Sequence, residues 1–144
     1  KIVEEYFVFE EMAKRALGRP WRNISGEERR EFIRLFKKLL FHAYVIRIEG
    51  TATPTIRTHY KGETIQGRYA LVKTQVANDK EPEFDIDYRL LLTGTEWKVY
   101  DVVIEGISLV GNYRQQFASI LDRQSFEGLM ENLREKAEME SGPS

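Results

Sequence analysis

The stretch from Trp97 to Phe117, WKVYDVVIEGISLVGNYRQQF, constrains the fold most, because it predicts a β-strand that turns directly into a helix. Its first half is rich in bulky and β-branched residues, on both parities, which favours a central strand with both faces covered. Gly106 ends that strand, and Ser108 is a good N-cap for a helix. Apolar residues then follow at helical spacing, at Leu109, Tyr113, Phe117 and Ile120.

Two amphipathic helices are predicted before any strand. The first runs from Val3 to Leu17 and ends at Gly18. The second begins at a capping box, Ser25 to Glu28, and runs to about Arg47. Its apolar side includes Phe32, Phe36, Leu39 and Tyr44, and its other side is basic, with Arg34 and Lys37. Such charges most often form a solvent-exposed helix face. The alternative is that they attract anionic lipid or an acidic partner.

The segment from about residue 55 to residue 104 predicts an antiparallel meander of about four strands. Strands are expected at 55–60 and 64–76 with a turn at 61–63, then at 84–90, and from Trp97 after a hairpin at 93–96. Ser125 caps a last helix. The order helix, helix, four strands, helix, helix predicts a single α+β domain over residues 1–140, with 141–144 a disordered tail or a vector remnant.

Composition excludes several classes of function. The formal net charge is -1, so electrostatic capture of nucleic acid is not expected. The chain has no Cys, which excludes disulfides and thiolate metal sites, and His42 and His59 stand alone, so no metal site is predicted. No apolar run approaches the roughly 20 residues of a membrane span. The chain begins at Lys1 without a visible signal peptide, which suggests a trimmed mature protein.

Asp101 is the strongest candidate for acid–base chemistry. It shares the parity of Trp97 and Val99, which would place it on their face of the strand. Asp85 and Asp87 instead alternate with the apolar residues of their strand, so they point to its other face. Carboxylates there are more often exposed and paired with a cation. An isomerase-like or small-molecule-binding cone that uses Asp101 is therefore one alternative.

Trp97–Phe117 also resembles a known family, through the pattern W-K-V-Y-D-V-x-I-E-G-I-S-L-V-x-N-Y-R-x-Q-F. This pattern resembles the MlaC/toluene-tolerance family of bacterial periplasmic proteins. The similarity extends over about residues 5–135, with further matching pieces at Phe7–Met12, Ala16–Gly18, Trp21–Arg22, Arg29–Phe32, Leu39 and Tyr44.

The resemblance implies a cone akin to the nuclear-transport-factor-2 and cystatin-like folds, made by a curved sheet with helices packed on it. It implies a non-enzymatic periplasmic monomer that carries phospholipid between the inner and outer membranes, with phospholipid as cargo and no cofactor. It also implies partners in an inner-membrane MlaD-type transporter complex and an outer-membrane MlaA-type lipoprotein complex. Members of the family carry a signal peptide and a further helical segment ahead of this chain's start.

Eight Phe, seven Tyr and two Trp are many large side chains for one such chain. Most should fill the core, and we expect others to line a cavity for acyl chains. The predicted lining residues are Phe32, Phe36, Leu39, Tyr69, Leu71, Ile86, Tyr88, Leu90, Val99, Val103, Leu109, Tyr113 and Phe117. A hopanoid or another apolar lipid is an alternative cargo, and a structural domain with a filled core is a further alternative.

Overall fold

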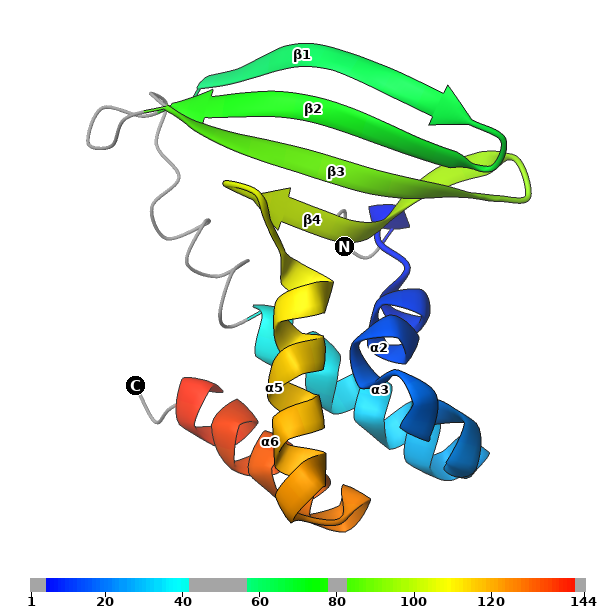
Figure 1. The fold of residues 1–144 in the computed structure, drawn as a ribbon, viewed down its shortest axis with the longest axis vertical. Coiled ribbons are helices and arrows are strands. Elements are labelled where there is room, and N and C mark those ends of the chain that lie inside the picture. Colours follow the sequence, from blue (N-terminus) through cyan, green and yellow to red (C-terminus); the bar gives the residue numbers. More distant parts are fainter. Residues whose placement is uncertain (1–4, 42–56, 78–82, 142–144) are drawn as a thin grey trace. The chain divides into compact units, whose positions relative to one another are not determined.

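The computed structural model describes residues 5–41, 57–77 and 83–141. These residues form an antiparallel sheet of five strands in the order β1-β2-β3-β4-β5, together with four α-helices and a short 3₁₀ helix, η1 (Figure 1). The strands are β1 Arg57–Gln66, β2 Tyr69–Ala77, β3 Phe84–Thr93, β4 Glu96–Ile104 and β5 Ile107–Ser108. The helices are α2 Phe9–Leu17, η1 Arg19–Asn23, α3 Gly26–Leu40, α5 Leu109–Arg123 and α6 Phe126–Ser141. The predicted α+β class is confirmed, and the fifth strand is only two residues long.

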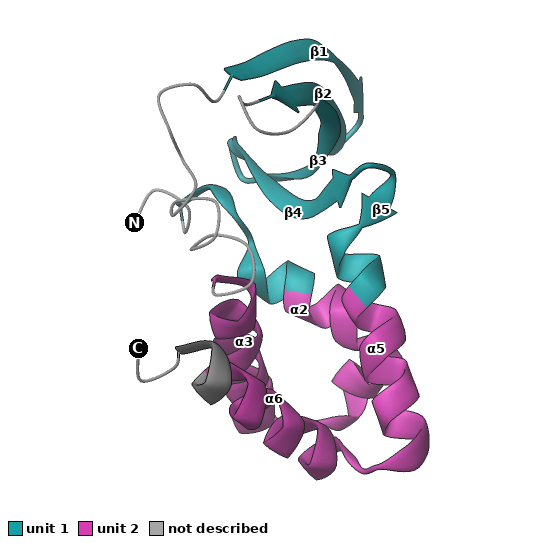
Figure 2. Ribbon diagram, turned by 90° about the vertical axis from the view of Figure 1, so that its left-hand side faces the viewer, with its two compact units in different colours: residues 1–12, 53–112 teal, residues 13–52, 113–144 magenta. Residues whose placement is uncertain are grey.

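The chain divides into two compact units, each built from two stretches of sequence (Figure 2). The sheet unit comprises residues 1–12 and 53–112, and the helical unit comprises residues 13–52 and 113–144. Helices α2 and α5 each contribute residues to both units. The single domain over residues 1–140 stays a prediction.

Strand β1 runs through the turn predicted at 61–63, so that prediction is wrong. The register shifts between Tyr60 and Gly62, and Gly62 has a φ of 144°, so the glycine serves a β-bulge within the strand. The chain reverses at Gly67 and Arg68 instead, where Gly67 has a φ of 60°. A glycine in the first position of a two-residue hairpin loop is typical of type II′ turns.

The outer edge of β4 is paired at both ends. At one end Val103 and Ile104 pair with Ser108 and Ile107 of β5. At the other end Phe7 makes a parallel bridge with Val99, whose carbonyl accepts a 2.9 Å hydrogen bond from the N–H of Val8. The helix predicted from Val3 to Leu17 is therefore interrupted here, because the backbone of this segment bonds to β4 rather than to itself.

The helical unit has an aromatic core centred on α3 and α5. The rings of Phe32, Phe36, Tyr113 and Phe117 are all buried and contact one another, with centroids 5.6–6.0 Å apart. Such edge-on and offset contacts add to the area that these large side chains bury. The predicted capping box of α3 is confirmed, since Ser25 and Glu28 each accept a hydrogen bond from the other's backbone N–H.

Three predicted features lie outside the described residues: the second helix beyond residue 41 with His42 and Tyr44, most of the turn at 77–82, and residues 142–144. The predicted hairpin at Thr93 and Glu96 is confirmed. The predicted caps of the last two helices are confirmed as well, because the hydroxyls of Ser108 and Ser125 accept from the N–H groups of Gly111 and Gly128.

Candidate functional site

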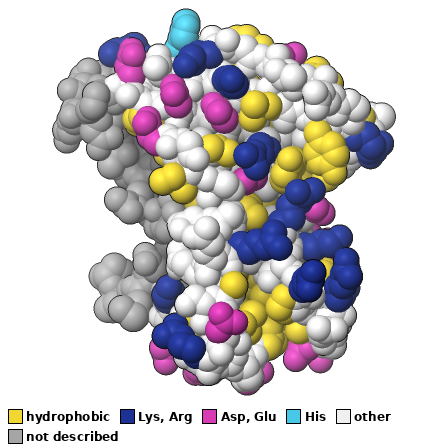
Figure 3. Space-filling model, viewed as in Figure 1, with side chains coloured by type: hydrophobic (Ala, Val, Ile, Leu, Met, Phe, Trp, Pro, Cys, Tyr) yellow, Lys and Arg dark blue, Asp and Glu magenta, His cyan; other side chains and the backbone are white. Residues whose placement is uncertain are grey.

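On strands β2, β3 and β4, one face of the sheet is almost entirely apolar. Cross-strand partners in an antiparallel sheet share a face, so the register identifies its members. We call this set the apolar face. It contains Ala70, Val72 and Val76 of β2, Phe84, Ile86, Tyr88, Leu90 and Leu92 of β3, and Trp97, Val99, Val102 and Ile104 of β4. Val99 is buried, whereas the other eleven are only half-buried. In Figure 3 the hydrophobic side chains at the surface over the strands lie among charged ones.

The polar groups that β2, β3 and β4 place within the apolar face are neutral, whereas β1 adds the carboxylate of Glu63 at the edge of the sheet, opposite Val72. Thr74 is buried, and its hydroxyl donates a 2.7 Å hydrogen bond to the carbonyl of Ile86. Burial raises the pKa of the Tyr88 hydroxyl above its ordinary value of 10.0, so this group carries no charge at neutral pH. The centre of the face therefore presents no ionised group to a ligand.

The opposite face, which we call the polar face, carries the charges of the same strands. The register places Lys73, Asp85, Asp87, Arg89 and Lys98 there. Tyr69 and Leu71 also point to this side. The predicted orientation of Asp85 and Asp87, away from the apolar residues of β3, is confirmed.

A β-bulge in β4 reverses the expected orientation of Asp101. The register shifts between Arg89 and Leu90, so Tyr100 is an extra residue between Val99, which pairs with Leu90, and Asp101, which pairs with Arg89. Asp101 therefore lies on the polar face, and its predicted sharing of a face with Trp97 and Val99 is wrong. The extra residue changes the parity of everything after it.

The carboxylate of Asp101 caps helix α5. One oxygen accepts from the N–H groups of Val102 at 2.8 Å and Val110 at 3.0 Å, and the other accepts from the Ser108 hydroxyl. That second oxygen also lies 3.6 Å from a guanidinium nitrogen of Arg89. A carboxylate is favoured at a helix N-terminus, where N–H groups lack partners within the helix. These contacts account for the burial of Asp101, which is 3% exposed.

The structure brings together four of the predicted lining residues on the apolar face, Ile86, Tyr88, Leu90 and Val99. It places Tyr69, Leu71 and Val103 on the polar face, so these three do not share a surface with the first four. Leu109 is half-buried at the start of α5.

The other five predicted lining residues, Phe32, Phe36, Leu39, Tyr113 and Phe117, belong to the helical unit. All five are buried, and the four rings pack on one another. Their contact with an acyl chain stays a prediction.

The prediction missed eight members of the apolar face: Ala70, Val72, Val76, Phe84, Leu92, Trp97, Val102 and Ile104. A signal existed in each strand. In β2, Lys73 and Gln75 share the parity of Tyr69 and Leu71, which marks that parity as the polar one. In β4, the apolar alternation changes phase around the charge of Asp101, which is the sequence signature of a bulge.

No cluster of three or more His, Cys, Asp or Glu side chains in ranges 5–41, 57–77 and 83–141 could hold a metal ion. Over the same ranges, none of the helices combines the length and hydropathy needed to cross a membrane.

Three comparisons with known proteins each give a match. The sequence model of the family described as MlaC protein matches residues 1–135. The intermembrane phospholipid transport system binding protein MlaC of Haemophilus influenzae is 23% identical over 135 residues, which are 92% of this chain and 63% of that protein. This chain therefore spans less than two thirds of that relative's length. A phospholipid-binding protein from Ralstonia solanacearum, solved in complex with a phospholipid, superposes with a TM-score of 0.86 at 26% identity, over 97% of this chain and 78% of that one.

Proposed function

This chain belongs to the MlaC family, and from that premise we propose that it is a periplasmic carrier that holds phospholipid by its acyl chains and moves it between the inner and outer membranes. The proposal includes the maintenance of outer-membrane lipid asymmetry. The acyl chains lie against the apolar face of the sheet.

The half-burial of the apolar face carries this proposal. Eleven of its twelve apolar side chains keep part of their surface accessible, whereas the four packed rings at the core of the helical unit are buried. An extended set of accessible apolar side chains on one face of a sheet is typical of a ligand-binding surface. An acyl chain of sixteen carbons gains on the order of 12 kcal/mol on leaving water, at about 0.8 kcal/mol per CH₂. Apolar contact alone therefore suffices for tight binding before ordering costs are subtracted.

Phospholipid is favoured over a hopanoid as cargo by the relatives. The Haemophilus protein is named for phospholipid transport, and the Ralstonia protein was solved with a phospholipid. The apolar face itself selects for hydrocarbon and not for a particular head group, because the polar groups of β2, β3 and β4 within it are neutral. We expect weak head-group selectivity at this site.

We propose MlaD-type and MlaA-type complexes as partners on the strength of the family. The basic side of α3 was one predicted docking surface. Arg34 in that surface is already engaged, since its guanidinium donates to both carboxylate oxygens of Glu31 at 3.1 and 2.6 Å. Reversing its charge tests the surface: unchanged lipid delivery by Arg34→Glu would exclude this residue from docking.

We propose that the protein has no catalytic activity. The observation in favour is the environment of Asp101, whose carboxylate accepts three hydrogen bonds and pairs with Arg89. A carboxylate committed in this way is poorly placed to take a proton from a substrate.

The test of the carrier function is native mass spectrometry of the purified protein, with lipid extraction, on two matched variants. Ile86→Glu places a charge on the apolar face, and Leu71→Glu places the same charge on the polar face, at a half-buried position opposite Arg89 of β3. We expect the wild type and Leu71→Glu to carry diacyl phospholipid and Ile86→Glu to lose it. Burying an unpaired carboxylate against hydrocarbon is strongly unfavourable.

Circular dichroism of both variants establishes that each is folded. Equal lipid content in the two variants would contradict binding at the apolar face. A bare apo mass in every preparation of the wild type, or an extracted polycyclic lipid, would contradict the phospholipid carrier itself.

A further inference from the structure

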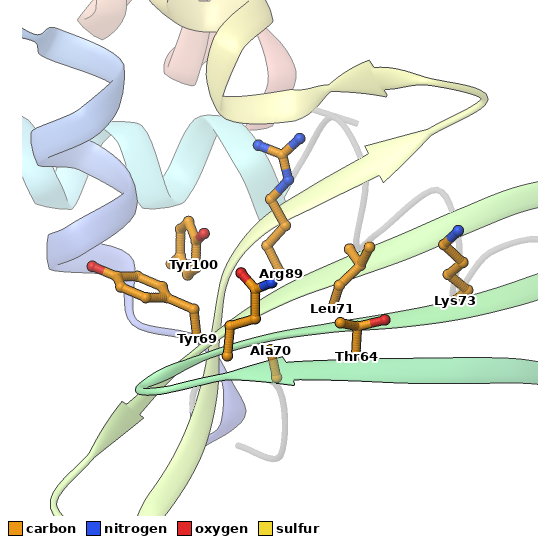
Figure 4. A pocket seen from close by; sticks show the side chains of 8 residues that line it. Thr64, Tyr69, Ala70, Leu71, Lys73, Arg89 and Tyr100 are labelled. Carbon is orange, nitrogen blue, oxygen red and sulfur yellow. The ribbon is translucent and has the colours of Figure 1, made fainter.

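The polar face holds a pocket of about 310 Å³ that the lipid-carrier function does not use. Its lining residues are Thr64, Gln66, Tyr69, Ala70, Leu71, Lys73, Arg89 and Tyr100. We call it the Arg89 pocket. In Figure 4 the side chains of Tyr69, Leu71, Lys73, Arg89 and Tyr100 lie on one side of the strands, and Ala70 points to the other.

The Arg89 pocket is cationic. It is lined by Lys73 and Arg89, and its lining includes no carboxylate. Across the strands Lys73 is paired in register with Asp87, yet its ammonium group makes no ion pair or hydrogen bond with any described residue. Cross-strand cations on an ordinary polar face are commonly paired with acids. Lys73 is therefore available to an external anion.

Arg89 is held in place and still has donors to offer. Its ion pair with Asp101 is 3.6 Å long, and that carboxylate also accepts from Ser108, Val102 and Val110. The side chain of Arg89 is 47% exposed. A guanidinium carries five N–H donors in a planar fork that matches two oxygens of a phosphate.

Neutral side chains line the rest of the Arg89 pocket. The side chains of Thr64 and Gln66 are exposed and make no hydrogen bond with the described residues, so their donors face the pocket unused. Tyr69 and Tyr100 pack edge to face, with ring centroids 5.9 Å apart. This aromatic pair offers an organic contact surface beside the two cations.

We propose that the Arg89 pocket binds a phosphate group that is part of a polar molecule about the size of a glycerophosphate head group. Its volume lies at the lower end of the range of small-molecule sites, about 300–1,000 Å³, so it has room for more than a bare phosphate ion.

This inference rests on the proposed function, because a lipid carrier meets phosphate head groups at each membrane. The register places the pocket and the apolar face on opposite sides of the sheet. The bound phosphate thus belongs to a second molecule and not to the lipid whose acyl chains lie on the apolar face. Its source is a lipid of the bilayer surface or a soluble glycerophosphate.

In the first arm of the test, the lipid-loaded protein is titrated with glycerol phosphate, and binding is monitored through the NMR chemical shifts of the backbone amides. We expect shifts at Leu71, Lys73 and Arg89, and about tenfold weaker binding in Lys73→Gln, since it removes one charge-assisted contact. The matched control is Lys61→Gln, which removes the same charge from β1, where Lys61 pairs with Asp85 at 3.4 Å outside the pocket. Lys73 has no partner to lose among the described residues, so we expect its substitution to leave the fold intact.

Absence of shifts at the pocket, or equal weakening in Lys73→Gln and Lys61→Gln, would overturn the proposal in favour of general electrostatic attraction. Arg89→Lys keeps the charge and loses the fork, so an intermediate affinity supports the assigned role of Arg89.

The second arm distinguishes the two sources with vesicles of phosphatidylglycerol in phosphatidylethanolamine. Loss of vesicle binding in Lys73→Gln, but not in Lys61→Gln, identifies a bilayer head group. Unchanged vesicle binding in a variant with weakened glycerol phosphate binding identifies a soluble ester. Native mass spectrometry of the same samples reports the cargo separately, so an empty pocket with retained phospholipid would refute this site and leave the carrier function standing.

Discussion

At the scale of single residues, Asp101 shows how a buried charge can be mistaken for a catalytic one. Its acidity, its place in an apolar strand and its predicted parity all favoured an active-site role. The structure gives it capping contacts to Ser108 and Val110 instead. The expected parity missed these contacts, because it ignored the bulge at Tyr100, which the change of phase in the apolar alternation of β4 marks.

We expect Asp101→Asn to lower the free energy of unfolding by about 1–3 kcal/mol, because an amide presents N–H donors where the carboxylate accepts. Its bound phospholipid should remain. Urea unfolding and native mass spectrometry measure the two effects. Asp87→Asn, on the polar face of β3, is the matched control and should change stability little. Loss of lipid from a folded Asp101→Asn variant would contradict a purely structural role.

Glu31 gives a prediction about pH. The hydrogen bond from Arg34 is the main reason that the pKa of Glu31 lies below its ordinary value of 4.5, and the charge of Arg134, 3.9 Å away on α6, lowers it further. A lowered pKa in the folded state stabilises the protein above the unfolded-state value, and this contribution disappears as the pH falls through the folded-state pKa. The contribution is therefore complete at neutral pH and lost in acid.

Urea unfolding of the wild type and Glu31→Gln measures this effect. We expect the variant to be less stable at about pH 7 and the difference to vanish at about pH 3. Because the pair is partly exposed, the difference should be small and should shrink with added salt. Glu135→Gln, on α6, is the control. A difference between wild type and Glu31→Gln that persists in acid would assign the effect to packing.

At the scale of the secondary structure elements, local signals predicted well and non-local ones did not. The caps at Ser25, Ser108 and Ser125 were all predicted, because a cap depends on residues three or four positions away. The break at Phe7 was missed, because it depends on Val99, ninety-two positions further along the chain. The apolar side of β3 was predicted from the strict alternation of its sequence. The apolar sides of β2 and β4 were missed, because β2 begins with apolar residues on both parities and β4 contains a bulge.

The capping box of α3 can be tested by Ser25→Ala. We expect a loss of about 1 kcal/mol in the free energy of unfolding, because the N–H of Glu28 loses its acceptor. Ser119→Ala, at an exposed interior position of α5, is the control and should be neutral or slightly stabilising. Equal effects of the two substitutions would show that the cap contributes nothing beyond helix propensity.

At the scale of the whole molecule, the family was predicted from Trp97–Phe117 and is confirmed by the match over residues 1–135. The α+β class was predicted as well. The lining residues were predicted only in part, because large apolar side chains serve both the buried core of the helical unit and the accessible face of the sheet. Sequence alone does not separate these two uses of Phe, Tyr and Leu.

We expect removal of the lipid to lower the unfolding temperature, since a ligand that binds only the folded state stabilises it by mass action. Differential scanning calorimetry of lipid-loaded and delipidated protein measures the change, and re-addition of phospholipid should restore it. Glycerol at the same concentration, which has neither acyl chains nor phosphate, is the control and should not restore the unfolding temperature. An unfolding temperature independent of lipid would show that lipid does not stabilise the folded protein and would contradict binding to the apolar face.

The bulge at Tyr100 also bears on how this sequence can change in length. At most positions of a strand, deleting a single residue would turn every later side chain of that strand to the wrong side of the sheet. Tyr100 is already surplus to the pairing of Val99 with Leu90 and of Asp101 with Arg89. Relatives that lack this one residue would keep the cap of α5 and the apolar face of β4 in place, so β4 offers a position at which the chain can shorten without rebuilding either surface.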